Sequence, residues 1–259
     1  FWKLQKKYNA TWYSAVPTIH QILLIRSEED NAPKKSFRFI RSCSAALAPS
    51  VLKDLEKRFG APVLEAYGMT EASHQMSSNP MPPEQRKAGS VGKPTGVKIN
   101  IMSMEKIGHM LSENQVGEVV IQGENVTSGY HNNEDANRDA YIDGWFRTGD
   151  QGFLDDDGYL NLTGRIKELI NRGGEKISPL EVDAILINHP SVNEAVCFAS
   201  PDEKYGEVVH AALVVNSEVS DKEIQEFCSK SLAKFKVPEK IYFAEKLPRT
   251  ATGKIQRRN

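Results

Sequence analysis

The sequence has few cysteines, no long apolar run and almost no net charge. Its three cysteines, Cys43, Cys197 and Cys228, lie far apart and show no disulfide or metal-ligand spacing, which excludes a disulfide scaffold and fits a reducing compartment. No apolar stretch approaches the ~20 residues that a membrane-spanning helix needs. The net charge of −1 excludes an overall field that would attract nucleic acid or a membrane surface.

Several motifs are also missing. The chain contains no Gly-x-Ser-x-Gly elbow, no zinc-binding helix motif and no Walker-A lysine loop. It begins without methionine, at Phe1 of an amphipathic pattern, and stops at Asn259 without a tail, so we expect it to be part of a longer protein. A hydrophobic content of 39% and a charged content of 26% are typical of soluble globular proteins, and 259 residues suffice for one large or two smaller domains.

Strands and helices alternate over residues 1–80. Apolar patterns predict strands at 11–16, 37–40 and 62–64. Between them, they predict a helix from Pro17 to Ile25 and another over 51–59 that stops at Gly60. This alternation predicts an α/β region with a parallel or mixed sheet.

The pattern changes twice further along the chain. Over 88–164, short strands at 97–102, 118–121, 153–154 and 159–162, a turn at 155–158 and one helix at 134–141 predict a small β-barrel or a distorted sheet. Over 165–259, we expect an α+β lobe with strands at 195–199, 208–215 and 241–243. Capping boxes at Ser178–Glu181 and Ser220–Glu223 predict the starts of its two helices.

The pentapeptide Tyr67-Gly68-Met69-Thr70-Glu71 follows the third predicted strand, where open α/β sheets bind ligands. Tyr67 offers a flat face for a purine and Gly68 allows close approach of the backbone. Thr70 offers a hydroxyl to a phosphate, and Glu71 a carboxylate oxygen to Mg²⁺. By itself the pentapeptide is equally compatible with an ordinary strand-to-loop corner that has a packed tyrosine and a solvated glutamate.

Three other clusters carry polar chemistry. Trp145–Asp150 predicts a loop carboxylate that accepts hydrogen bonds from ribose hydroxyls, or a turn in which Asp150 caps backbone amides. Gly164–Lys176 contains a diglycine turn, which a ligand could approach closely or which could be a solvated hairpin. Pro248–Ile255 presents Lys254 on a small-residue loop, as a mobile charge for a carboxylate and phosphate or as part of a basic tail.

In order and spacing, these four clusters resemble the adenylate-forming superfamily of acyl-CoA synthetases, peptide-synthetase adenylation domains and luciferases. The resemblance covers essentially the whole chain. It implies that residues 1–164 are the C-terminal part of an AMP-binding N-terminal domain, and that 165–259 form a small mobile lobe with the catalytic lysine. It also implies that the phosphate-cradling loop of the family lies N-terminal to Phe1, so we expect residues 1–259 alone to be inactive or nearly so.

The resemblance implies a role for each motif residue. Tyr67 and Gly68 bind adenine, Thr70 contacts the α-phosphate, Glu71 holds Mg²⁺ and Asp150 binds the ribose. The loop Ser44-Ala45-Ala46 lies along the acyl and adenine site, Arg165 contacts the ribose region and Lys167 lies at the hinge of the lobe. The residues Gly173-Gly174-Glu175-Lys176 line the path of the coenzyme A thiol. Lys254 bridges the carboxylate and the α-phosphate.

The implied reaction uses ATP, Mg²⁺ and coenzyme A. A carboxylic acid attacks the α-phosphate of ATP to give acyl-AMP, and a thiol then displaces AMP. Because carboxylate and polyphosphate repel each other, Mg²⁺ and Lys254 offset the charge of the transition state.

Locally, the segments Arg41–Pro49, Met69–His74 and Lys167–Pro179 resemble the oxalate–CoA ligase branch of fungi and plants, also called peroxisomal-CoA-synthetase-like proteins. This resemblance implies a short polar substrate such as oxalate, whose distal carboxylate meets Ser44 and His74, and a location in the peroxisome or the cytoplasm. His74 is equally compatible with a structural role. Gly68 departs from the alanine that we expect in this branch.

Other functions stay open from the sequence. A medium-chain or aryl acyl-CoA synthetase, and an adenylation domain that loads a carrier protein, share the same chemistry. A non-catalytic nucleotide or RNA interaction module is the alternative of another class, but no RNA-binding signature accompanies the basic tail, so we expect no nucleic-acid partner.

Overall fold

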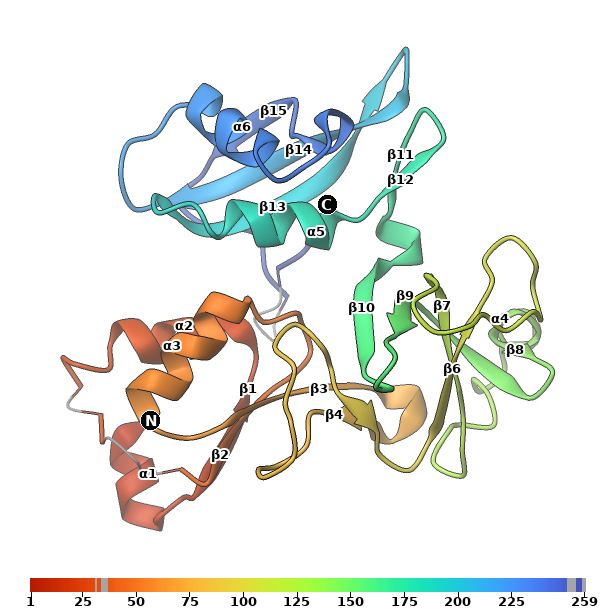
Figure 1. The fold of residues 1–259 in the computed structure, drawn as a ribbon, viewed down its shortest axis with the longest axis horizontal. Helices are drawn as coiled ribbons and strands as arrows, with labels where there is room; N and C mark the ends of the chain where they lie inside the picture. Colours follow the sequence, from red (N-terminus) through yellow and green to blue (C-terminus); the bar gives the residue numbers. More distant parts are fainter. Residues whose placement is uncertain (31, 34–36, 251–254, 258–259) are drawn as a thin grey trace. The chain divides into compact units, whose positions relative to one another are not determined.

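Two units make up the chain, Phe1–Leu162 and Thr163–Asn259. The structure, a computed structural model shown in Figure 1, describes residues 1–30, 32–33, 37–250 and 255–257. Among the helices of this described part, none combines the length and the apolar character that crossing a membrane requires. The predicted α/β and α+β regions are confirmed, and each unit is described below by itself.

The first sheet of unit 1 is mixed, as predicted for residues 1–80. Its strands run in the order β1-β2-β3-β4-β5, with β1 to β3 parallel and β3 to β5 antiparallel. The register places Tyr13 opposite Ile40, and Ile40 opposite Val63. The strands are β1 (Trp12–Ala15), β2 (Phe39–Ser42), β3 (Val63–Met69), β4 (His74–Ser78) and β5 (Lys93–Pro94).

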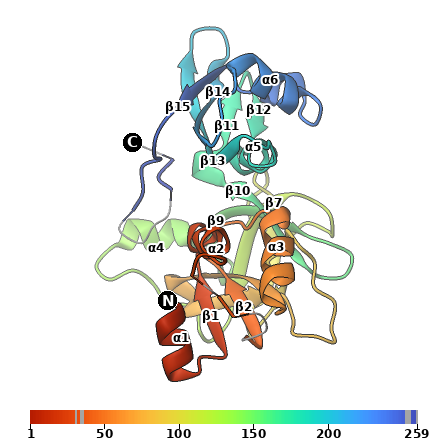
Figure 2. The same cartoon turned by 90° about the vertical axis from the view of Figure 1, so that its left-hand side faces the viewer.

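Three helices accompany this sheet, α1 (Trp2–Tyr8), α2 (Pro17–Ile25) and α3 (Pro49–Phe59). Both α2 and α3 begin with proline, whose fixed φ suits the first helical turn. The predicted stop at Gly60 is confirmed, because this residue takes the left-handed conformation that ends α3. Figure 2 shows α2 and α3 side by side, and their core with β2 and β3 includes Trp2, Phe37 and Phe59.

A second sheet begins in unit 1 and follows the order β10-β9-β7-β6, with β8 paired to β9; only the last three residues of β10 belong to unit 2. This is the distorted-sheet alternative of the prediction, because the register shifts between Glu118 and Val120. Tyr67 of β3 belongs to its core together with Ile121 and Phe146, so this strand of the first sheet also contributes to the core of the second. The elements are β6 (Lys98–Met102), β7 (Gly117–Gln122), α4 (Glu134–Ala140), β8 (Tyr141–Ile142), β9 (Trp145–Leu154) and β10 (Leu160–Arg165).

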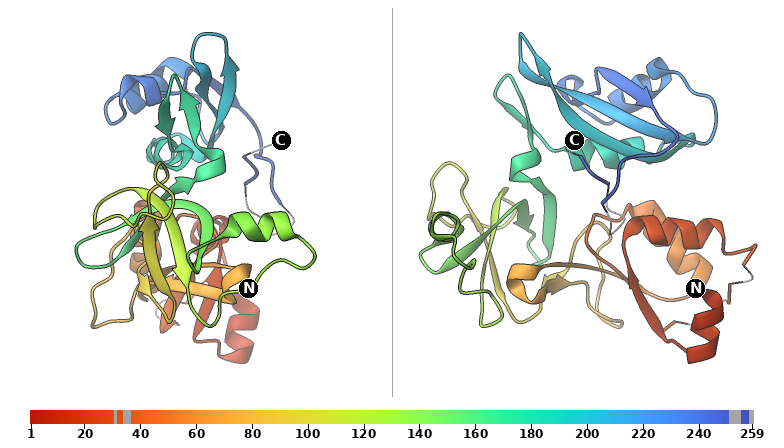
Figure 3. Two further views of the ribbon diagram at one scale, coloured as in Figure 1. Left: turned by 90° about the vertical axis from the view of Figure 1, so that its right-hand side faces the viewer. Right: turned by 180° about the vertical axis from the view of Figure 1, so that it is seen from behind.

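Unit 2 contains a sheet in the order β12-β11-β14-β13, with β15 parallel to β14. The long β13–β14 hairpin is visible in Figure 3, and α5 and α6 share its core through Leu186, Cys197 and Ile224. The elements are η2 (Ile166–Glu168), β11 (Ile170–Arg172), β12 (Glu175–Ile177), α5 (Pro179–Leu186), β13 (Val192–Asp202), β14 (Gly206–Val215), α6 (Asp221–Ser229), η3 (Lys234–Lys236) and β15 (Lys240–Phe243).

Two predicted loops are wrong. The third strand does not end before the pentapeptide, because β3 continues through Met69, and only Thr70–Ala72 leave it as a short 3₁₀ helix, η1. Asp150 does not lie on a loop either, since Trp145–Leu154 form one strand, in which burial alternates from Trp145 to Asp150. The predicted strand at 37–40 is shifted two residues toward the C-terminus.

One of the two predicted capping boxes forms. Ser220 and Glu223 exchange the expected hydrogen bonds at the start of α6. At α5, Ser178 is the N-cap residue but makes no capping bond, because its hydroxyl donates to the carbonyl oxygen of Thr163 instead. A tertiary acceptor therefore replaces the local one that the sequence predicted.

Candidate active site

Tyr67 and Asp150 lie together although 83 residues separate them. The Tyr67 hydroxyl donates to Asp150 Oδ2 at 2.5 Å, and the two residues are only 8% and 5% exposed. The bond joins the end of β3 to the middle of β9. The structure thus brings together two residues that the sequence assigned to the nucleotide, with the phenol held by the carboxylate.

A bulge in β9 sets the position of Asp150. Three residues of β9, 148–150, face the single residue Val119 of β7. Thr148 Oγ1 donates to the Val119 carbonyl at 2.7 Å and accepts the Asp150 N–H at 3.1 Å. Gly149, with φ of 71°, makes this turn of the backbone without a side-chain clash.

The 3₁₀ helix Thr70–Ala72 is held by the loop 123–133, which the sequence did not connect to the site. The Tyr130 hydroxyl donates to Glu71 Oε1 at 3.0 Å, and the Thr127 N–H donates to the Glu71 carbonyl at 2.7 Å. Asn125 donates to the carbonyl of Ala72 at 2.7 Å. Burial and the Glu71 charge raise the pKa of Tyr130. No local pattern predicts these contacts, because they join segments more than 50 residues apart.

Glu71 and Thr70 could supply a magnesium ion with only a few protein ligands. Thr70 is exposed and Glu71 is half-buried, so both can reach a ligand. In the described ranges, no group of three or more His, Cys, Asp or Glu side chains could hold a metal. Mg²⁺ commonly takes one or two protein carboxylates and completes its octahedron with phosphate and water. Glu71 therefore suits an ion that arrives with a nucleotide.

Gly68 allows β3 and β4 to approach closely. A Cβ at this position would lie 1.7 Å from the His74 carbonyl oxygen and 2.9 Å from its Nδ1. His74 is exposed and has φ of 87°. Gly68 thus fixes the distance between the nucleotide motif and the predicted substrate residue.

An open groove of about 610 Å³ lies along one face of the first sheet. Arg41 crosses it, donating to Ser14 Oγ at 3.3 Å and to Gln75 Oε1 at 3.2 Å. The groove contains His74 but not Ser44, whose exposed hydroxyl instead contacts Cys43 Sγ at 3.7 Å. The lining residues are Trp12, Ser14, Phe39, Arg41, Leu64, His74, Gln75 and Ser78.

Arg41 is a candidate that the sequence analysis missed. Its two acceptors are a neutral hydroxyl and an amide oxygen, and among the described residues it makes no ion pair with a carboxylate. A guanidinium whose charge is not matched by an acid suits an anionic ligand. Strand register pairs Arg41 with Ser14, but the contact of Arg41 with Gln75 spans two strands and is visible only in the three-dimensional structure.

Glu65 connects two loops next to the motif. Its carboxylate accepts the Gly89 N–H at 2.9 Å and also a backbone hydrogen bond from Leu47, at the end of the Ser44-Ala45-Ala46 loop. Burial raises the pKa of Glu65 from 4.5 to about 7, although both hydrogen bonds favour the ionised form. These three exposed loop residues are thus held at their C-terminal end by a buried acid.

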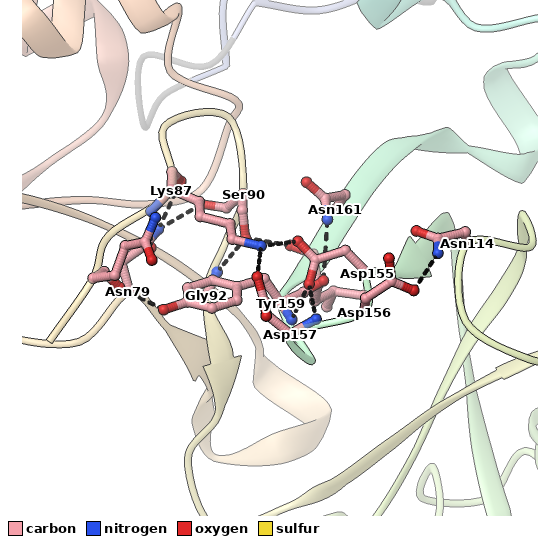
Figure 4. A network of polar contacts seen from close by, with 12 residues as sticks. Asn79, Lys87, Ser90, Gly92, Asn114, Asp155, Asp156, Asp157, Tyr159 and Asn161 are labelled. Atoms are coloured by element: carbon pink, nitrogen blue, oxygen red, sulfur yellow. Dashed lines mark hydrogen bonds and ion pairs between the residues drawn. The ribbon is translucent and has the colours of Figure 1, made fainter.

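The loop that carries Gly89 is fixed by a network around Lys87, shown in Figure 4. Lys87 Nζ lies 2.7 Å from both Asp155 Oδ2 and Asp157 Oδ2, and 4.6 Å from the centre of the Tyr159 ring. Hydrogen bonds and charge from Asp155 and Asp157 raise the pKa of Lys87 to about 12. The predicted turn 155–158 is confirmed, and it holds the Gly89 loop that bonds to Glu65.

Glu65 gives a pH-dependent stability. The pKa of Glu65 is about 7 in the folded chain and 4.5 is the ordinary value, so the folded chain binds the proton more tightly than the unfolded chain. The contribution of Glu65 to stability is therefore greatest below pH 4.5 and is lost above pH 7. We expect stability to fall as the pH rises from about 4.5 to 7, by up to ~3 kcal/mol from this residue.

The glutamine of Glu65→Gln cannot ionise. The melting temperature of this variant, relative to that of the parent protein, should therefore increase as the pH rises from 5 to 8. The matched control is Glu113→Gln at an exposed position. A constant difference between parent and Glu65→Gln across this range would contradict the assignment.

In unit 2, the predicted residues lie on exposed segments. Arg165 ends β10 and Lys167 lies in η2, both exposed. Gly173 and Gly174 form the turn between β11 and β12, with φ of 59° and 98°, and Gly173-Gly174-Glu175-Lys176 are exposed throughout. The Gly173 N–H donates to the Tyr205 carbonyl at 2.8 Å. Lys254 lies outside the described residues.

Two protein families match the sequence of this chain. The family described as AMP-binding enzyme matches residues 1–131, and the AMP-binding enzyme C-terminal domain matches residues 181–254. An oxalate–CoA ligase of Arabidopsis thaliana is 58% identical over 264 residues, covering 100% of this chain and 51% of that protein. An oxalate–CoA ligase of Saccharomyces cerevisiae is 55% identical over 262 residues, covering 100% of this chain and 48% of that protein.

A solved structure extends the similarity to the fold. The o-succinylbenzoate CoA synthetase of Bacillus subtilis, in complex with its acyl-adenylate intermediate, superposes with a TM-score of 0.86 at 36% identity. The superposition covers 98% of this chain and 51% of the synthetase. The chain thus spans about half the length of the relatives it matches. With a family match over residues 1–131 and the resemblance of four ordered motifs, the chain belongs to the AMP-binding enzyme family.

Proposed function

We propose that the full-length protein containing this chain is an AMP-forming acid–CoA ligase that acts on oxalate. The observation that carries this proposal is the similarity of the whole chain to two oxalate–CoA ligases, at 58% and 55% identity. ATP and coenzyme A are its co-substrates, and Mg²⁺ accompanies the nucleotide. The similarity to oxalate–CoA ligases is compatible with a location in the peroxisome or the cytoplasm.

The first half-reaction joins the acid to AMP. An oxalate oxygen attacks the α-phosphorus of ATP, and the bond to the bridging oxygen breaks so that pyrophosphate leaves. In the second half-reaction the coenzyme A sulfur attacks the acyl carbon, AMP leaves with the electron pair of the broken C–O bond, and the thiol loses its proton.

Residues of unit 1 hold the nucleotide in this proposal. Asp150 binds the Tyr67 hydroxyl and is the proposed acceptor for ribose hydroxyls, and the Tyr67 ring lies beside adenine together with Gly68. Thr70 contacts the α-phosphate. Glu71, oriented by Tyr130, holds Mg²⁺, which supplies charge neutralisation on the phosphates when it is bound.

Residues of unit 2 act in turn in the two half-reactions. Lys254 stabilises the charge of the adenylation transition state, and Arg165 contacts the ribose region. After a rotation about Lys167, Gly173-Gly174-Glu175-Lys176 line the thiol path. Two half-reactions at one site need two arrangements of groups, which explains a mobile lobe at 165–259 after a domain that ends at 164.

Arg41 and His74 provide the recognition of a second carboxylate. Oxalate carries one carboxylate that reacts and one that must be bound. Arg41 crosses the groove that contains His74, and no described carboxylate neutralises it. A charge-assisted hydrogen bond to the distal carboxylate would favour a dicarboxylate over an acid with an apolar tail. Ser44, outside the groove lining, keeps its proposed contact with the substrate from the adjacent loop.

The test is a substrate series with the full-length enzyme. Oxalate, malonate, acetate, coumarate and octanoate are compared by kcat/KM for AMP formation, with oxalate expected to be best. In Arg41→Met, kcat/KM for oxalate should fall about 10- to 100-fold, because a hydrogen bond to a charged group contributes ~1.5–3 kcal/mol, while that for acetate stays within about threefold.

Arg38→Met at an exposed position near the same strand is the control. A preference for octanoate or coumarate would exclude the oxalate proposal. AMP release that does not depend on free coenzyme A would point to a carrier protein as acceptor instead.

A further inference from the structure

A buried arginine near the end of the chain joins three elements of unit 2. Arg257 Nη2 lies 2.7 Å from Asp183 Oδ2 in α5, and Arg257 Nε lies 3.1 Å from Glu168 Oε2 in η2. Arg257 Nη1 donates to the Cys197 carbonyl in β13 at 2.5 Å. The Arg257 side chain is 13% exposed, so hydrogen bonds to these protein acceptors take the place of most of its contacts with water.

The charges of this cluster depend on one another. Burial lowers the pKa of the Arg257 guanidinium, but Asp183 and Glu168 outweigh that effect and the pKa is raised. Burial also raises the pKa of Asp183, and Arg257 opposes this shift. Asp183 Oδ1 further accepts the Cys197 N–H at 2.6 Å. Removing the arginine would leave Asp183 buried without its cation.

The chain on either side of residues 251–254 is attached to unit 2. Arg249 and Ile255 form a β-bridge, and the Gln256 N–H donates to the Pro248 carbonyl at 2.9 Å. Arg249 also pairs with Glu194 of β13 at 2.7 Å. The segment that leads to Lys254 and the segment that leaves it are therefore paired and bound to the same strand.

Glu168 connects this attachment to the predicted hinge. It follows Lys167 directly in η2, and its ion pair with Arg257 joins residues 89 positions apart. Resting on the proposed function, we propose that Arg257 is a positioning residue that ties the Lys254 segment to the hinge segment. Arg257 touches no reacting atom and acts through the placement of Lys254.

Arginine suits this position because its planar fork serves several acceptors at once. Each of its three nitrogens donates a hydrogen bond to a different element, η2, β13 or α5. A lysine at 257 would keep the charge but present a single point with rotatable donors. Arg257→Lys therefore separates the fixed geometry from the charge.

The experiment measures the two half-reactions of the full-length enzyme separately. In Arg257→Lys, oxalyl-AMP formation at saturating substrates should fall about 10- to 100-fold, since a misplacement of about 1 Å has effects of this size. The KM for ATP and the rate of thioester formation from supplied oxalyl-AMP should stay within about twofold. Glu168→Gln should change the same step in the same direction.

The matched control is Lys236→Gln, which removes another ion pair of α5, that of Lys236 with Glu181 at 2.8 Å. It should leave both half-reactions unchanged. Equal losses in both half-reactions of Arg257→Lys would overturn the positioning role and indicate general destabilisation.

A second measurement does not depend on activity. Without substrates, Arg257→Lys and Glu168→Gln should each speed amide hydrogen exchange in residues 248–257 and in residues 164–170 together. Unchanged exchange over 248–257 in Glu168→Gln would overturn the proposed link. If the parent enzyme does not adenylate oxalate, the proposed function fails, and hydrogen exchange still decides whether the two segments are coupled.

Discussion

Lys254→Ala in the full-length enzyme is expected to lower the rate of oxalyl-AMP formation by about 10²–10³-fold. A carboxylate approaching the α-phosphate meets negative charge, and a preorganised ammonium group offsets it mainly in the transition state. The rate is measured as oxalate-dependent exchange of pyrophosphate into ATP. The second half-reaction, started from supplied oxalyl-AMP, should keep most of its rate, because it needs no new bond at phosphorus.

Lys246→Ala is the matched control, since this lysine is exposed and lies near the same segment. It should leave both half-reactions as they are. An adenylation rate in Lys254→Ala equal to that of the parent would remove the central group of the proposed mechanism and favour a non-catalytic nucleotide-binding role.

Asp150→Ala is expected to raise the KM for ATP by about 10- to 100-fold. The carboxylate is the proposed acceptor for ribose hydroxyls, and a hydrogen bond to a charged group contributes ~1.5–3 kcal/mol. The same change removes the Asp150 acceptor of the buried Tyr67 hydroxyl, which costs about 1–3 kcal/mol of stability. Steady-state kinetics and thermal unfolding measure the two effects separately.

Tyr67→Phe separates the structural role of the bond from nucleotide binding. Phenylalanine keeps the flat ring and the Asp150 carboxylate but removes the hydroxyl that joins them. We expect a stability loss of about 1 kcal/mol and a KM for ATP within about threefold of the parent. Equal increases of KM in both variants would mean that the tyrosine–aspartate bond, and not a ribose contact, controls ATP affinity.

Residues with local signals were predicted well from the sequence. The proline that opens α2, the stop at Gly60 and the Ser220–Glu223 capping box all act within a few residues of chain. Asp150 stays a predicted site residue, but its predicted local structure was wrong, because it lies in β9 and not on a loop. The alternation of buried residues in β9 was hidden by Gly149, whose bulge looks like turn chemistry.

Contacts between distant segments could not be predicted. Nothing near Ser178 indicates that the Thr163 carbonyl competes for its hydroxyl, and the capping box failed for that reason. Arg41 became a candidate only when the structure showed its guanidinium bonded to Gln75 of β4, although β3 lies between their strands. Tyr130 joined Glu71 through a loop that has no periodic pattern. The motifs thus proposed candidate residues, while tertiary contacts decided how these residues are held.

The hydrogen bond between Tyr67 and Asp150 also has a consequence for biosynthesis. Its two partners are 83 residues apart, and a ribosome that adds about 5–20 residues per second needs roughly 4–17 s to bridge that interval. During this time the emerging β3 carries a tyrosine whose acceptor has not yet been made. The bond between Tyr67 and Asp150 is therefore a late contact of the nascent chain, formed only after Asp150 of β9 has been synthesised.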